Sequence, residues 1–282
     1  MGIKTFKPTT AGRRHMVSLT YDEITHKGPE KSLIKRLKNN AGRNNLGKIT
    51  TRHRGGGARR IYRMVDFKQT DKLNIPATVK TIEYDPNRSS FIMLVAYRDG
   101  EKRYHLAPAG VTVGEEIITK VKAKPKVGNR MKLENIPVGF QIFNLELTPG
   151  SGGQMIRSAG SSGKLVSLEG AMAHVQLASG EVRLVSKDCY ATLGVVSNSD
   201  HANVIHGKAG TRRHMGWRPT VRGKVMNPCD HPHGGGEARN SIGLKHPKTP
   251  WGKPALGHKT RNRKKHSNAS IVTRRPSRKQ KK

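Results

Sequence analysis

The sequence predicts an all-β fold in which small antiparallel barrels lie between two long, basic and irregular arms. Three observations support this prediction. The middle of the chain holds short apolar segments separated by turn residues, and helical periodicity is nearly absent there. The two ends are rich in Gly, Pro, Lys and Arg and hold too few apolar residues for a core of their own. The charge follows the same division, because the ends are strongly cationic and the middle is close to neutral.

The first 65 residues are expected to form a basic extension. They carry 16 Lys and Arg against 3 Asp and Glu. One helix is expected over residues 31–39, where the apolar side chains share one helical face. The Gly- and Arg-rich residues 51–60 that follow cannot contribute to an apolar core.

Nine strands are expected in the middle of the chain, where residues 66–200 carry 17 basic against 14 acidic side chains. Their apolar residues alternate or form short continuous runs, and Asp99-Gly100 is a strong hairpin signal. The expected strands cover residues 77–83, 91–97, 101–106, 116–122, 139–147, 164–169, 172–177, 181–185 and 190–196. The Pro- and Gly-containing residues 124–128 are the expected boundary between two barrels.

The second basic extension begins at about residue 201 and carries 21 Lys and Arg against 2 acidic residues. Its Gly, Pro and His content predicts no regular element beyond a turn or two. Two arms of this charge need a polyanionic partner, because their own repulsion opposes any compact arrangement. Nucleic acid is such a partner, since its phosphates release counterions when Lys and Arg neutralise them.

The composition also excludes several classes of protein. Two cysteines, Cys189 and Cys229, form no disulfide framework and fit a reducing compartment. The longest apolar run, residues 91–97, is too short for a membrane span, and no secretion signal or membrane-binding amphipathic helix is expected. Aromatic residues are only 5% of the chain, which disfavours base stacking on single strands and favours phosphate and shape contacts to folded RNA.

The densest local signal lies in residues 226–239, where three consecutive glycines follow a segment rich in Pro and His. Consecutive glycines let a backbone lie directly against another surface, because no Cβ intervenes. Pro228 and Pro232 stiffen the approach, and basic residues surround it. This pattern favours a loop threaded into folded RNA over a flexible linker.

Other kinds of site fit the same residues less well. Cys229, His231 and His233 are of types that bind zinc, but no second ligand pair has the usual spacing. Asp230, His231 and Ser241 are residue types of a hydrolase, but nothing orders them into a triad. No glycine-rich segment has the spacing of an NTPase phosphate loop. We therefore expect no catalytic residue, no metal and no cofactor.

Two arginines in the middle of the chain lie on turns of the expected barrels, where binding residues are often found. Arg88 lies in the turn 84–88, and Arg157 follows the Gly-rich residues 149–156. From the residues alone, each is more readily explained as a solvated surface side chain.

Several segments carry a family resemblance, namely residues 7–10, 42–45, 52–57, 82–88, 99–104, 219–239 and 249–252. In these segments, and nearly from end to end, the chain resembles the second protein of the large ribosomal subunit, the ribosomal protein L-two family of bacterial or organellar type. Residues 226–237 are close to diagnostic of that family. One departure is Cys229, where the family usually has Val.

The resemblance implies an oligonucleotide-binding (OB) type barrel over residues 66–125 and an SH3-like barrel over residues 126–200, between extensions at 1–65 and 201–282. It implies a structural, non-enzymatic protein of the large ribosomal subunit that binds ribosomal RNA, in the cytoplasm or in an organelle. It also implies neighbouring ribosomal proteins as partners, a bridge to the small subunit, a role in assembly, and a loop near the peptidyl transferase region. The rival interpretations are an enzyme that uses Asp230 and His231, and a free nucleic-acid chaperone.

The residues expected to bind RNA combine the basic and glycine-rich segments with what the resemblance implies, which replaces the surface interpretation of the two barrel arginines. They are Arg52, His53, Arg54, Gly55, Gly56, Gly57, Arg59, Arg60, Arg88, Arg157, Arg212, Arg213, Trp217, Arg218, Arg222, Asn227, Asp230, His231, His233, Gly234, Gly235, Gly236, Arg239 and Trp251.

Overall fold

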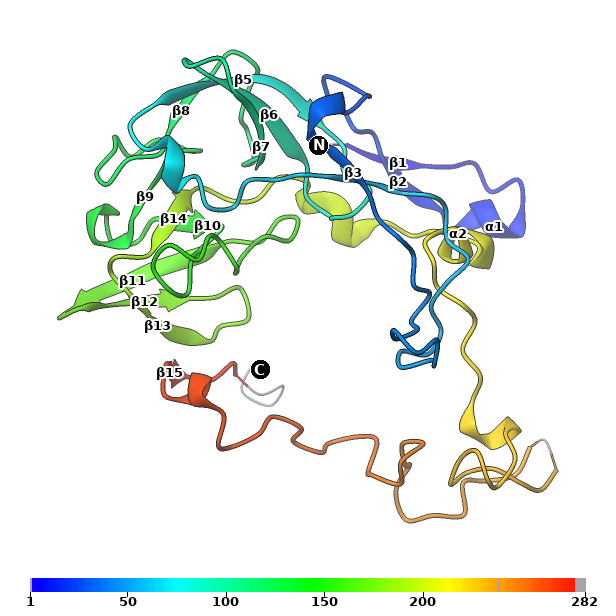
Figure 1. Ribbon diagram of the computed structural model, residues 1–282. Coiled ribbons are helices and arrows are strands. Elements are labelled where there is room, and N and C mark those ends of the chain that lie inside the picture. Colours follow the sequence, from blue (N-terminus) through cyan, green and yellow to red (C-terminus); the bar gives the residue numbers. More distant parts are fainter. Residues whose placement is uncertain (1, 238, 277–282) are drawn as a thin grey trace. The chain divides into compact units, whose positions relative to one another are not determined.

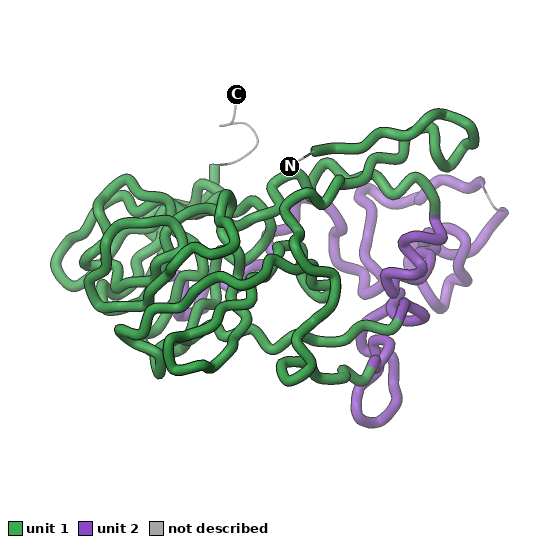
Figure 2. Tube along the Cα trace, turned by 90° about the horizontal axis from the view of Figure 1, so that it is seen from above, with its two compact units in different colours: residues 1–38, 59–208, 269–282 green, residues 39–58, 209–268 purple. Residues whose placement is uncertain are grey.

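The computed structural model describes residues 2–237 and 239–276 (Figure 1). The chain is divided between two compact units, coloured green and purple in Figure 2. Unit 1 comprises Met1–Lys38, Arg59–Lys208 and Ala269–Lys282, and unit 2 comprises Asn39–Ala58 and Ala209–Asn268. The divisions fall inside the basic segments, so each arm contributes residues to both units.

The first barrel of unit 1 is built on a four-stranded antiparallel sheet in the order β7-β6-β5-β8. Its strands are β5 (Pro76–Glu83), β6 (Ile92–Tyr97), β7 (Lys102–Leu106) and β8 (Glu116–Ile118). Val79, Phe91 and Val95 are fully buried in its core. The register between β5 and β6 shifts after Val79, and such a bulge bends a strand as barrel closure requires.

The second barrel of unit 1 contains a seven-stranded sheet in the order β15-β13-β12-β11-β10-β14-β9. Its strands are β9 (Arg130–Lys132), β10 (Gln141–Phe143), β11 (Gly163–Glu169), β12 (Met172–Gln176), β13 (Val182–Ser186), β14 (Tyr190–Leu193) and β15 (Ile271–Thr273). A separate apolar core includes Leu133, Ile142 and Leu165. The expected all-β fold with an OB-type barrel followed by an SH3-like barrel is confirmed.

Short elements occur in both arms. Two antiparallel pairs join β1 (Ile3–Thr5) to β2 (Val17–Leu19) and β3 (Ile34–Arg36) to β4 (Ile61–Arg63). The helices are α1 (Ala11–Arg14), η1 (Lys31–Leu33), η2 (Thr70–Lys72), η3 (Leu133–Asn135), η4 (Ser199–Asn203), α2 (Ala209–His214), η5 (Gly223–Val225) and η6 (His266–Asn268). In the described part of the chain, no helix has the length and apolar character that crossing a membrane requires.

The helix expected over residues 31–39 is wrong. One 3₁₀ turn, η1, is followed directly by β3, which pairs with β4. Leu33 packs with Val65 against the buried Tyr104 of the first barrel. This tertiary packing outweighs the local helical pattern. The structure also has more regular elements in the second arm than the turn or two expected there, including α2 and β15.

The two barrels are joined inside unit 1 by backbone pairing and by a shared apolar cluster. Bridges link Pro108 to Val196 and Thr119 to Arg130. The cluster contains Leu106, Phe143 and Val196, with Phe67 and Ile156 packed against it. Side chains from both barrels therefore have fixed positions relative to one another.

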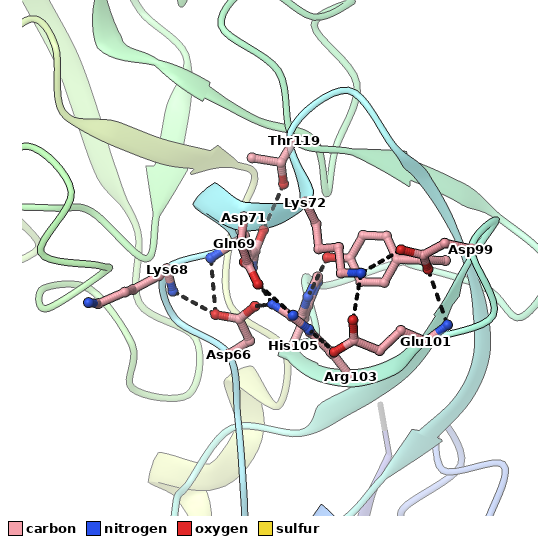
Figure 3. A network of polar contacts seen from close by, with 11 residues as sticks. Asp66, Lys68, Gln69, Asp71, Lys72, Asp99, Glu101, Arg103, His105 and Thr119 are labelled. Atoms are coloured by element: carbon pink, nitrogen blue, oxygen red, sulfur yellow. Dashed lines mark hydrogen bonds and ion pairs between the residues drawn. The ribbon is translucent and has the colours of Figure 1, made fainter.

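A network of ion pairs covers one face of the first barrel (Figure 3). Its members are Asp66, Asp71, Lys72, Asp99, Glu101 and Arg103. Arg103 forms three ion pairs at 2.6–2.7 Å, and its hydrogen bond lowers the pKa of Asp71. Four carboxylates against two cations make this network net negative in a chain of net charge +35. It is therefore a poor surface for RNA phosphates.

His105 lies beneath this network and is fully buried (Figure 3). Its Nε2 is 3.1 Å from the hydroxyl of Tyr97. Burial lowers the pKa of His105 to about 4, so the imidazole is neutral near pH 7. It belongs to the barrel core and adds no charge to the surface.

Candidate nucleic-acid interface

Arg88 and Arg157 line the same cavity of unit 1, although they come from different barrels. The cavity has a volume of about 380 Å³. It is lined by Tyr62, Phe67, Asn87, Arg88, Ser89, Leu106, Arg157 and Ser158. Two arginines that the sequence places about 70 residues apart are therefore expected to act on one ligand group.

Both guanidinium groups are held by neighbours in the cavity wall. Arg88 Nε lies 2.6 Å from a carboxylate oxygen of Asp85, which is fully buried. Arg157 Nη1 donates to the carbonyl of Gly153 at 3.2 Å. The guanidinium carbons lie 5.6 Å and 4.5 Å, respectively, from the ring centroid of Phe67. This ring lies against both cations and restricts their orientation.

Guanidinium groups fixed in this way can bind phosphate oxygens with two parallel hydrogen bonds. Each arginine uses one of its nitrogens in the contacts above, so further N–H donors remain for a ligand. Tyr62 and Phe67 add aromatic surface that suits a base or a sugar. Sequence analysis missed both aromatic residues, because nothing in their local sequence distinguishes them from core residues.

In unit 2, the glycine-rich segment of the first arm pairs with a segment of the second arm. The Gly55 N–H donates to the Gly216 carbonyl at 2.9 Å, and the Arg218 N–H donates to the His53 carbonyl at 3.0 Å. A Cβ on Gly57 would lie 2.8 Å from the backbone of Gly216, which is closer than real Cβ contacts. Glycine is therefore required for this pairing, whether or not RNA also contacts it.

Basic side chains line this paired region. The Arg54 guanidinium carbon lies 3.6 Å from the ring centroid of Trp217, an arrangement in which the cation lies on the aromatic face. Arg213 Nη1 donates to the carbonyls of Gly55 and Trp217 at 3.3 and 3.5 Å. The structure thus brings together residues from the two arms that sequence analysis selected independently.

The loop around His231 is folded on its own side chains within unit 2. His231 is buried, and its Nδ1 accepts a hydrogen bond from the His233 N–H at 3.0 Å. His233 Nε2 in turn accepts from the Lys248 N–H at 2.8 Å. Desolvation and the adjacent His231 lower the pKa of His233. Each ring thus accepts one backbone hydrogen bond, through Nδ1 in His231 and through Nε2 in His233.

Two glycines make this arrangement sterically feasible. A Cβ on Gly223 would lie 2.4 Å from His231 Nδ1, and one on Gly234 would lie 2.2 Å from the Asn227 carbonyl oxygen. Part of the glycine content of this loop is therefore explained by its own packing. That internal requirement was not part of the sequence interpretation, which considered only an external surface.

Within residues 2–237 and 239–276, no hydrogen bond joins Asp230, His231 and Ser241 into a triad. No group of three His, Cys, Asp or Glu side chains in the same ranges could hold a metal ion.

The other selected residues lie on the two units and are exposed, except for the half-buried Gly235. Arg59 and Arg60 belong to unit 1. Arg52, Arg212, Arg222, Asn227, Asp230, Arg239 and Trp251 belong to unit 2, and Gly56, Gly235 and Gly236 lie there with positive φ. Trp251 is 77% exposed, which is unusual for a side chain of this size and suits a residue that contacts a partner.

Two protein-family models match the chain. The description "Ribosomal Proteins L2, RNA binding N-terminal domain" matches residues 30–119. The description "Ribosomal Proteins L2, C-terminal domain" matches residues 126–252. The two matches include both arginines of the inter-barrel cavity, both paired arm segments and the His231 loop.

Proposed function

Because the chain belongs to the ribosomal protein L2 family, we propose that it binds large-subunit RNA through a rigid surface in unit 1 and a basic, glycine-rich surface in unit 2. Membership makes it a structural, RNA-binding protein of the large ribosomal subunit. The observation that carries the detailed proposal is the convergence of Arg88 and Arg157 on one cavity.

The rigid surface docks by shape and charge. Arg88 and Arg157 bind phosphate or a base edge of one RNA segment, and Phe67 keeps both guanidinium groups in place. Because the barrels are joined by buried contacts, this site is preorganised and little entropy is lost on binding.

The basic surface of unit 2 neutralises phosphates inside the folded RNA. Its paired segments, residues 53–58 and 214–218, present arginines around close backbone contacts. The His231 loop supports the RNA of the peptidyl transferase region, where it acts as a shaped wedge and the chemistry belongs to the RNA. In this proposal the protein is not an enzyme.

Further partners follow from the family. The protein contacts neighbouring ribosomal proteins, supports assembly of the large subunit and contributes to a bridge with the small subunit. The protein is located in the ribosomes of the cytoplasm or of an organelle.

Sedimentation tests this function directly. After a high-salt wash, the full chain should remain with large subunits, and its crosslinks should map to large-subunit RNA. A free nucleic-acid chaperone would be released by salt together with RNA of mixed origin, and an enzyme would show activity in the soluble fraction. Either result would contradict the proposal.

His231→Gln should assemble into particles and keep the wild-type pH profile of peptide-bond formation. His231 accepts a hydrogen bond from the His233 N–H. The glutamine side chain also has an acceptor oxygen for this N–H, so the loop can keep its shape. The measurement is single-turnover peptide transfer against pH in fully assembled particles. Loss of an ionisation near the ordinary histidine pKa of ~6.5 would instead assign His231 a catalytic role.

A structural comparison accompanies this variant. Gly223→Ala places a Cβ against the His231 ring and should disturb the loop while leaving the imidazole in the chain. Its particles should be fewer, but those that assemble should show the same pH profile.

A further inference from the structure

A second cavity of unit 1 lies on the first barrel, between the strands β5, β6 and β7 (Figure 1) and residues 26–31 of the first arm. Its volume is about 610 Å³, larger than that of the cavity between Arg88 and Arg157. This is within the range of about 300–1,000 Å³ typical of small-ligand sites. None of its lining residues belongs to the RNA-binding residues discussed above.

Basic side chains from three separate segments line this cavity. Lys80 lies on β5, Lys102 on β7, and His26 and Lys31 in the arm segment. Lys31 and Lys80 form no ion pair within residues 2–237 and 239–276. Lys102 Nζ is 3.1 Å from Glu30, which is half-buried and also lines the cavity, so this lysine is already paired with a carboxylate. The lining therefore offers two ammonium groups without an ion pair, Lys31 and Lys80, and the paired Lys102 beside them.

The buried carboxylate of Glu83 has its own partners and does not oppose an anion strongly. Its two oxygens accept hydrogen bonds from the Tyr104 hydroxyl at 2.8 Å and from the Thr81 hydroxyl at 3.0 Å. Arg63 Nε lies 3.9 Å away and offsets its charge. Leu94, which is nearly buried, adds an apolar wall suited to a ribose.

The arm segment is fixed on the barrel by hydrogen bonds. The Glu30 N–H donates to the Tyr104 hydroxyl at 2.7 Å, and the Thr25 N–H donates to the Ile82 carbonyl at 3.0 Å. The cavity is therefore formed within unit 1 itself, before any contact with RNA.

We propose that this cavity binds one backbone phosphate of large-subunit RNA with its adjoining sugar. The inference rests on the proposed function and adds a docking point on the first barrel that is independent of the two arginines. The lysines supply the charge, and the apolar wall and preformed shape hold a single nucleotide unit.

The test compares two double variants of the full chain. Lys31→Ala/Lys80→Ala removes two charges from the cavity, and Lys120→Ala/Lys122→Ala removes two exposed charges of the same barrel region outside it. The cavity variant should bind a large-subunit RNA transcript about tenfold more weakly. The slope of its log binding constant against log salt concentration should be shallower by ~0.7–0.9, the value for one phosphate contact. The matched variant should lose less than threefold.

A second measurement asks for direct contact. A photoreactive group on Lys80→Cys, in a Cys229→Ser background that leaves only the buried Cys189, should crosslink to one short RNA segment. Equal losses in the two double variants, or no crosslink, would overturn the proposal. If the wild type binds the transcript, Arg88→Ala weakens that binding and the two lysine double variants bind equally well, only the cavity proposal fails. If wild type itself does not bind, the proposed function fails.

Discussion

Replacing both Arg88 and Arg157 with Ala should weaken binding of the free chain to large-subunit RNA by about a hundredfold, whereas each single replacement should cost about thirtyfold. A thirtyfold loss corresponds to about 2 kcal/mol, the usual range for a charge-assisted hydrogen bond to phosphate. The double loss is smaller than the product of the single losses, because both groups line one cavity and contact Phe67.

The measurement is a double-mutant cycle by filter binding at one fixed salt concentration. Arg98→Ala is the control, since Arg98 is 74% exposed on the first barrel and lies 3.8 Å from Glu116. It should change affinity less than twofold. Strictly multiplicative losses would mean that the two arginines contact different RNA segments, and unchanged affinity would make them ordinary surface residues.

The fold was predictable where the sequence pattern is long enough to be periodic. The alternation around Val79, the continuous apolar run of β6 and the Asp99-Gly100 turn all correspond to observed elements. The three-residue strands β9 and β15 carry no such pattern, because partners distant in sequence define them. The predicted division of the chain into residues 1–65, 66–125, 126–200 and 201–282 stays a prediction.

The sequence proposes the site residues one by one, and their contacts with RNA stay predictions; it does not predict their geometry. Arg88 and Arg157 stand out as arginines on turns, yet only the packing of Leu106, Phe143 and Val196 places them at one cavity. The lysine-lined cavity gave no local signal at all, since its cations come from β5, β7 and the first arm. Convergence of this kind is set by topology, which single-sequence patterns do not encode.

Removing one partner of the buried ion pair in the second barrel should cost far more stability than breaking an exposed pair. Arg130 and Glu146 are both fully buried, and Arg130 Nη2 lies 2.9 Å from Glu146 Oε1. Glu146 Oε2 also accepts the N–H groups of Tyr190 at 3.1 Å and Gly150 at 3.3 Å. One carboxylate therefore joins β9, β14 and the turn that leads toward Arg157.

Glu146→Gln should lower the free energy of unfolding of the barrels by about 3–5 kcal/mol, because it leaves the Arg130 charge buried without its counter-ion. Both tryptophans, Trp217 and Trp251, lie in unit 2, so urea unfolding is followed by far-UV circular dichroism and tyrosine fluorescence. The control, Glu116→Gln, breaks an exposed pair and should cost less than about 1 kcal/mol.

The double variant Arg130→Met/Glu146→Leu distinguishes the cost of an uncompensated buried charge from the cost of the lost hydrogen bonds. Replacing both partners with apolar side chains removes the uncompensated charge, so this variant should be more stable than Glu146→Gln by about 2 kcal/mol or more. The Tyr190 and Gly150 N–H groups lose their acceptor, which keeps the double variant below wild type. A double variant no more stable than Glu146→Gln would assign the loss to those two N–H groups, and a loss below 1 kcal/mol in Glu146→Gln would show that water reaches the pair.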